Sequence, residues 1–129
     1  MAEKSVVRTE RAPAPFQGAP YSQAIRVGDL VFVSGQLALR PGEKELSGGS
    51  IQEQTGQIFQ NLEAILGEAG SGLDKLVKTT VFLQSLDDFA GMNEVYASRV
   101  GDRPPARSTV EVAQLPSGAL VEIDAIAHL

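Results

Sequence analysis

Two charged residues near the end of the chain stand in stretches that otherwise look like apolar strands. Arg107 lies near the start of "ARSTVEV", and Glu122 lies inside "LVEIDAIA". A charged side chain in such a strand is solvated on an exposed face, paired with an opposite charge, or functional. A guanidinium can bind a carboxylate bidentately, and a carboxylate can position water and move a proton. Position alone leaves a structural salt bridge open for Arg107 and a buried structural acid open for Glu122.

The remaining residue types narrow the chemistry. The sequence has no cysteine, which excludes disulfides, thiolate nucleophiles and metal sites with Cys ligands. With one histidine, His128, one chain cannot build a Ser-His-Asp triad or a site with several histidine ligands. We therefore expect no metal site and no cofactor, and a chemistry based on carboxylates, Arg, Tyr, hydroxyl groups and the backbone.

Length and charge set the class of protein. The 129 residues are 43% hydrophobic and 21% charged, which predicts one folded domain over residues 1–129. The formal net charge is −5 and the basic residues are dispersed, so binding to nucleic acid through a basic face is not expected. No apolar run approaches the roughly 20 residues of a membrane span, and no signal sequence is visible. We expect a cytoplasmic protein, although an organellar protein whose transit peptide had been removed would look the same.

The first half of the chain predicts strands followed by a helix. Residues 1–20 look irregular, with "SVVRT" as a candidate edge strand. Strands at 22–27 and 30–35 should form a hairpin about a Gly-Asp turn. Ser50 and Glu53 form a capping-box signature, and apolar residues at helical spacing follow as far as Gly70.

The second half predicts a strand, a helix and two strands. "KLVKTTVFL" is rich in β-branched residues, and a helix should start at Ser85 or Asp87 and end at Gly101. Two closing strands complete the chain. The order of elements predicts an α+β fold in which two helices pack on one face of a sheet.

Alternation of side chains along a strand predicts the face that each charge takes. If Val110 and Val112 face the helices, Arg107 points to the open face of the sheet. Ile123 should likewise face the helices, so Glu122 should share the open face with Arg107. Apolar residues of the other strands must also lie there, which predicts self-association that covers this face.

Several stretches match a known family: "APYSQAI" with "LVFVSGQ", "QTGQIFQNLEAIL" with "LVKTTVFL" and "DDFAGMNEVYA", and "PPARSTVEVAQLP" with "VEIDAIA". On these residues the chain resembles the RidA/YjgF family of reactive-intermediate deaminases, from about Tyr21 to Ala127. The resemblance implies a chorismate-mutase-like subunit with a mixed sheet in which the last strand is central. It also implies a homotrimer in which the sheets form a barrel and the clefts lie between subunits.

The resemblance further implies an activity and a set of site residues. The activity is hydrolytic deamination of 2-aminoacrylate and 2-imino acids, such as 2-iminopropanoate and 2-iminobutanoate, to 2-keto acids and ammonia. Arg107 matches the carboxylate-binding arginine and Glu122 the glutamate that positions water. The other positions that match the family's substrate-binding residues are Tyr21, Ser34, Gly35, Asn93 and Thr109.

Two positions depart from the family pattern, and two other functions compete. Thr109 replaces a common Cys, and its backbone should preserve the contact with the substrate. In many members a Gly directly precedes the Pro at this position. Here Ala19 lies between Gly18 and Pro20, which should affect the conformation of the cleft entrance near Tyr21. The alternatives are a non-catalytic ligand-binding or chaperone-like trimer and an endoribonuclease or translation inhibitor. The negative charge and the lack of an internal histidine disfavour the nuclease.

Overall fold

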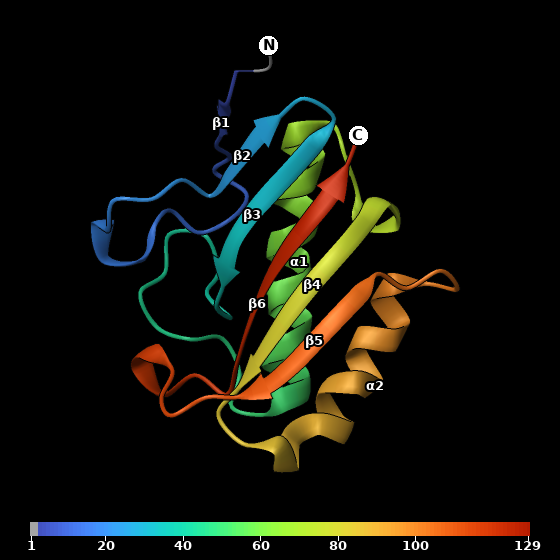
Figure 1. Cartoon of the computed structure of the whole chain (residues 1–129). Helices are drawn as coiled ribbons and strands as arrows, with labels where there is room; N and C mark the ends of the chain where they lie inside the picture. The colour runs from blue at the N-terminus through green and yellow to red at the C-terminus, as the bar shows by residue number, and fades with distance from the viewer. Residues whose placement is uncertain (1–2) are drawn as a thin grey trace.

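Six strands form one mixed sheet, and two helices cover one of its faces (Figure 1). The structure, a computed structural model, describes residues 3–129. The strands are β1 (Ser5–Val7), β2 (Ala24–Val27), β3 (Leu30–Gln36), β4 (Leu76–Leu83), β5 (Ala106–Glu111) and β6 (Val121–His128). The helices are α1 (Ile51–Ala69) and α2 (Phe89–Val100), with short 3₁₀ turns η1 (Phe16–Gly18), η2 (Leu73–Lys75), η3 (Leu86–Asp88) and η4 (Pro116–Gly118). The predicted α+β arrangement is confirmed.

Helix α1 has the two ends that the sequence predicts. The Ser50 hydroxyl accepts the Glu53 N–H at 3.0 Å, and the Glu53 carboxylate accepts the Ser50 N–H at 3.3 Å. Two of the backbone N–H groups that have no partner within the helix are thereby satisfied. The helix ends at Gly70, whose φ of 89° is in the left-handed region that glycine adopts without strain. The apolar stripe of α1 is buried against the sheet.

Helix α2 begins later than predicted. Ser85 caps the 3₁₀ turn η3 instead, where its hydroxyl accepts the Asp87 N–H at 3.1 Å. The helix proper starts at Phe89 and buries Met92 and Tyr96 on the side that faces α1 and the sheet. Phe89 stays partly exposed, which leaves its ring available to the neighbouring β5.

The order of strands is β1-β2-β3-β6-β4-β5, so β6 is central and the last two strands do not form a hairpin. This confirms the arrangement that the family resemblance implied. Strand β5 runs parallel to β4 and forms one edge of the sheet, whereas β1 forms the other edge. The expected edge strand near the N-terminus is therefore present. None of the helices in residues 3–129 is both long enough and apolar enough to cross a membrane.

The prediction that Arg107 and Glu122 share the open face is wrong for Arg107. Arg107 is the partner of Thr79, which is fully buried beneath the helices, so the Arg107 side chain lies on the helix side of β5. Val110 instead lies on the open face of the sheet and is 42% exposed. Its partner on β4 is Phe82, which on its other side pairs with Glu122 of β6. The prediction assumed that valine in an edge strand takes the covered face. Helix α2 reaches β5 with Phe89 and Tyr96, and the arginine takes that face because it stacks on their rings.

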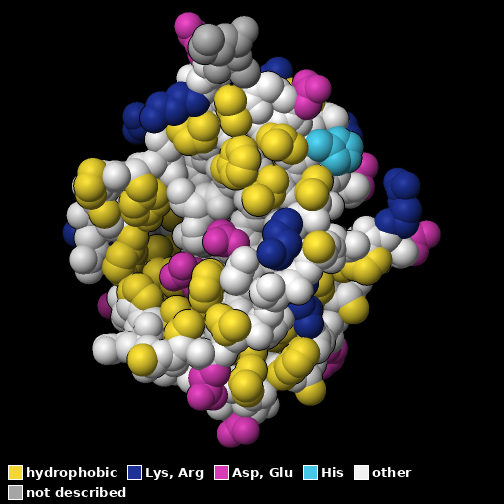
Figure 2. Space-filling view, in the orientation of Figure 1, with side chains coloured by type: hydrophobic (Ala, Val, Ile, Leu, Met, Phe, Trp, Pro, Cys, Tyr) yellow, Lys and Arg dark blue, Asp and Glu magenta, His cyan; other side chains and the backbone are white. Residues whose placement is uncertain are grey.

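The open face of the sheet carries exposed hydrophobic side chains (Figure 2). They gather over the β1–β3 end, where Val6, Leu30 and Phe32 are between 39% and 64% exposed. Acidic side chains from the β6 region lie near the middle of the same view. A surface of this kind is typical of a face that another protein surface covers.

Candidate functional site

Glu122 lies in the wall of a cavity of about 370 Å³ at one end of the open face. Its strand, β6, is held between β3 and β4, so the position of its backbone is fixed on both sides. Other residues from the predicted site also line this cavity, namely Tyr21, Ser34 and Gly35. The structure thus brings together one half of the predicted site.

A bulge in β3 allows the close approach of Gly35 to Glu122. Val33 pairs with Ala125 and Gln36 pairs with Ile123, so Ser34 and Gly35 together oppose one residue of β6. A Cβ atom on Gly35 would collide with the Glu122 carboxylate. Glycine is therefore needed at this position for a steric reason. The Ser34 hydroxyl donates to the Ser22 carbonyl at 2.6 Å, which ties the bulge to the segment after Tyr21.

Tyr21 holds the loop at the mouth of the cavity. Its hydroxyl accepts the backbone N–H of Phe16, and 41% of the residue remains exposed. The buried Gln23 secures the preceding segment, because its side chain pairs with both backbone groups of Thr9 and donates to the Pro13 carbonyl at 2.8 Å. The extra Ala19 is accommodated in this loop, directly after η1.

Burial raises the pKa of the Glu122 carboxyl above its ordinary value near 4.5, and the negative charge of Asp124 raises it further. Desolvation is the larger cause. The acid is therefore poised to exchange protons closer to neutral pH than a surface glutamate, which is a common feature of functional carboxyls.

We expect Glu122→Gln to stabilise the fold more at pH 7 than at pH 4. A raised pKa means that the stability contributed by Glu122 is complete below pH 4.5 and is lost as the pH rises through the folded-state pKa. Glutamine does not ionise, so it avoids this loss. Denaturant midpoints of both proteins at pH 4 and pH 7 measure the effect. An equal difference between variant and wild type at the two pH values would show that Glu122 is not perturbed.

Arg107 is held between two aromatic rings of α2 on the other side of the sheet. Its Cζ atom lies 4.7 Å from the centre of the Tyr96 ring and 5.5 Å from that of Phe89. Its Nη1 donates to Asn93 Oδ1 at 2.7 Å, so Asn93 contacts the arginine and does not face solvent freely. Tyr96 is itself anchored by a 2.7 Å hydrogen bond between its hydroxyl and that of Thr79. The guanidinium is therefore oriented before any ligand arrives.

Thr109 lies two residues beyond Arg107 on the same edge strand. The Val112 N–H donates to the Leu83 carbonyl, and partners alternate along a parallel strand. The N–H and C=O groups of Arg107 and Thr109 therefore point away from β4, toward the free edge. Within residues 3–129 the buried Thr109 hydroxyl has no hydrogen-bond partner.

The predicted site residues thus form two clusters on one chain. One contains Glu122, and the other contains Arg107 on the opposite face of the sheet. Across residues 3–129 the only ion pair is Arg11 with Glu68, so neither Arg107 nor Glu122 is in an intrachain salt bridge. The structure does not bring the two clusters into one cavity of a single chain.

Sequence reasoning missed the aromatic residues that hold Arg107. Phe89 and Tyr96 share one face of the helix with Asn93, which the family resemblance did place in the site, so the spacing was a usable signal. Helical spacing by itself predicts that such aromatic residues pack in the core, and it does not show that they lie against Arg107. Phe16, which also lines the Glu122 cavity, gave no such signal because it stands in an irregular segment.

Comparison with known proteins assigns the chain to a family. A family model described as Endoribonuclease L-PSP matches residues 9–129. A RutC family protein of Pyrococcus abyssi is 50% identical over 97% of this chain and 97% of that protein. Reactive Intermediate Deaminase A, chloroplastic, of Arabidopsis thaliana is 45% identical over 98% of this chain and 67% of that protein. The solved structure of RidA from the Antarctic bacterium Psychrobacter has a TM-score of 0.91 at 42% identity, with 97% of this chain and 99% of that chain covered. The chain therefore belongs to the RidA/YjgF family, whose members include RutC and reactive-intermediate deaminase proteins.

Proposed function

We propose that this protein hydrolyses 2-imino acids, including 2-iminopropanoate and 2-iminobutanoate, to 2-keto acids and ammonia. The observation that carries the proposal is the cavity beside Glu122, where a half-buried carboxyl with a raised pKa stands without an intrachain ion pair among the described residues. The name of the Arabidopsis relative, a reactive intermediate deaminase, supports the same class of reaction.

In the proposed mechanism Arg107 binds the carboxylate of the substrate. Asn93 accepts a hydrogen bond from Nη1 of Arg107. The Nε–Nη2 edge of the guanidinium therefore remains available for a bidentate contact with a carboxylate. The outward N–H of Thr109 offers a further donor on the same strand edge. Such an arrangement fixes the plane of the imino acid, and orientation alone accounts for much of the acceleration of a reaction whose substrate is already labile to water.

Glu122 in its ionised form positions a water molecule and accepts a proton from it as the oxygen adds to C2 of the protonated imine. The adduct carries a hydroxyl and an amino group on C2. Transfer of the proton to the nitrogen converts it to ammonium, which leaves with the electrons of the C–N bond. The C2 hydroxyl gives its proton to the departing ammonia as the keto group forms, so the products are the 2-keto acid and ammonium.

The two clusters can act together only if they come from different copies of the chain. We therefore propose that the site is composite, with Glu122 from one subunit and Arg107 from its neighbour in a homotrimer. The exposed apolar side chains of the open face and the free edge of β5 support this assembly. Size-exclusion chromatography with light scattering measures the mass of the particle, and a monomer would contradict the composite site.

The activity is tested by generating imines in situ with an amino-acid oxidase and following the release of keto acid above the uncatalysed rate. Wild-type protein should accelerate the release. Protein that binds 2-ketobutanoate but does not accelerate the reaction would favour the non-catalytic ligand-binding alternative.

We expect Phe89→Ala to weaken binding of carboxylate substrates while leaving the chemical step intact. The ring lies against Arg107, and a partly exposed cation–π contact is worth roughly 0.5–2 kcal/mol, which corresponds to roughly 2- to 30-fold in KM. Phe89→Tyr should retain the contact and restore KM. Leu86→Ala, which removes another exposed apolar side chain of the same region, is the matched control. A fall in kcat with unchanged KM would contradict this role for Phe89.

The family description also names an endoribonuclease, so RNA cleavage is the comparison assay. The formal charge of −5 per chain opposes binding to phosphate backbones. Homogeneous protein that bound RNA with a strong salt dependence and cleaved it would revive that function.

A further inference from the structure

A second and larger cavity lies next to the one that contains Glu122. The inner cavity, beside Glu122, has a volume of about 370 Å³, and the outer cavity has about 510 Å³. Both are lined by Phe16, Leu39 and the Pro13–Ala14 segment. Phe16 has the largest of the shared side chains and lines both spaces, so it lies at the wall between them.

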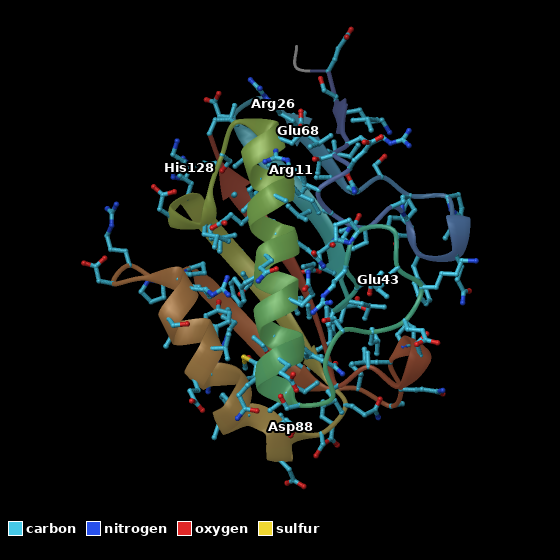
Figure 3. All side chains as sticks on the ribbon, turned by 180° about the vertical axis from the view of Figure 1, so that it is seen from behind. Arg11, Arg26, Glu43, Glu68, Asp88 and His128 are labelled. Carbon is cyan, nitrogen blue, oxygen red and sulfur yellow. The ribbon has the colours of Figure 1, made fainter. Side chains whose placement is uncertain are left out.

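Turns η1 and η4 and the connection between β3 and α1 surround the outer cavity. Figure 1 shows that these three segments gather at one side of the molecule, and Figure 3 shows Glu43 on the connection, on that side. Gln17 of η1, Ser117 of η4, and Glu43 and Lys44 of the connection line the outer cavity but not the inner one. The outer cavity thus has both apolar lining residues and two charged ones, Glu43 and Lys44.

The wall is anchored at two places. The Phe16 N–H donates to the Tyr21 hydroxyl, and the Phe16 carbonyl accepts the Ala19 N–H at 3.1 Å. The ring packs against a small hydrophobic cluster that is separate from the main core and consists of Leu37, Leu39, Leu115 and Ala119. A side chain fixed through both its backbone and its ring is expected to keep its position when ligands enter.

The opposite rim repeats the same backbone. Gln17 and Gly18 have φ values of 54° and 69°, and Ser117 and Gly118 have φ values of 57° and 71°. In η4 the Ala119 N–H donates to the Pro116 carbonyl at 3.0 Å, which mirrors the bond of Ala19 in η1. Two matched tight turns, η1 and η4, therefore contribute residues to both cavities.

We infer that Phe16 determines specificity by limiting the length of the substrate's side chain. The inference rests on the proposed function, because the imino acid must place C2 beside Glu122. From there a short alkyl group fits the inner cavity, and a longer one meets the Phe16 ring. The outer cavity has apolar surface that would accept a longer alkyl chain if the ring were removed, and each buried methylene is worth about 0.8 kcal/mol.

The test uses imines of a straight-chain series, generated from alanine, 2-aminobutanoate, norvaline and norleucine. Phe16→Ala should raise kcat/KM for the norleucine imine relative to the 2-aminobutanoate imine by roughly 10-fold or more, since two methylenes gain about 4-fold each. Phe16→Leu should give an intermediate ratio. Lys44→Ala alters the rim of the outer cavity and leaves the wall in place, so it should keep the wild-type ratio.

An unchanged ratio in Phe16→Ala protein that still turns over the 2-aminobutanoate imine would overturn the inference. If Phe16→Ala does not fold, as judged by circular dichroism, the ratio for Phe16→Leu decides in the same way. Failure of the proposed function is a separate result, namely no turnover of any imine by the wild type. In that case calorimetry with 2-ketobutanoate and 2-ketohexanoate tests whether Phe16 limits the length of a bound ligand, independently of any turnover. A selective gain in affinity of Phe16→Ala for the longer acid supports the inference, and an equal change for both contradicts it.

Discussion

Arg107→Ala should lower kcat/KM for imine hydrolysis by roughly 100- to 30,000-fold, because a bidentate pair of charge-assisted hydrogen bonds contributes roughly 3–6 kcal/mol to binding. The fold should survive, since Arg107 is not in an ion pair within residues 3–129 and lies on an edge strand. The proposed trimer should remain intact as well. Lysine at this position should restore only part of the activity, because an ammonium group cannot form the planar bidentate contact.

Arg103→Ala is the matched control for Arg107→Ala. Arg103 is exposed in the turn before β5. It lines neither the Glu122 cavity nor a separate cavity of about 440 Å³ that Arg107, Asn93 and Tyr96 line, so its removal should change kcat/KM little. Light scattering on Arg107→Ala distinguishes a structural role of the arginine from the binding of the substrate's carboxylate, the two roles that the sequence left open. If the variant dissociates into monomers, the arginine is a structural contact between subunits and the carboxylate-binding role is wrong.

Glu122→Gln should lower kcat by roughly 100- to 10,000-fold, the usual contribution of a positioned proton acceptor, and should leave ligand binding nearly unchanged. The amide can still hydrogen-bond a water molecule but cannot accept its proton. Calorimetry with 2-ketobutanoate checks binding, and the coupled assay measures turnover. Undiminished turnover would remove Glu122 from the mechanism.

Asp124→Asn provides both a control and a pH test for Glu122. Asp124 lies on the same face of β6, two residues further along, and does not line the cavity. Its charge raises the pKa of Glu122, after the larger effect of burial. The wild-type rate should fall as the pH drops through this raised pKa, because the ionised acid is the active form. Asp124→Asn should keep kcat near neutral pH and shift that fall to lower pH, and an unshifted profile would contradict the assignment.

The sequence by itself determined the elements and the ends of the first helix. Ser50, Glu53 and Gly70 act through hydrogen bonds and backbone angles within a few residues, so their effect does not depend on the rest of the fold. The Gly28 turn between β2 and β3 is local in the same sense. The family resemblance added the central position of β6, which involves contacts between distant segments and which strand composition alone did not predict.

Only the tertiary structure decided the faces and the partners of the site residues. Whether Arg107 or Val110 faces the helices depends on the register of β5 against β4 and on how far α2 extends, and both are long-range properties. The same is true of the close contact between Gly35 and Glu122, which requires a bulge opposite β6. The sequence placed two charges in two strands, and packing placed them on opposite faces, because side-chain alternation defines two sets of residues but not which set is buried.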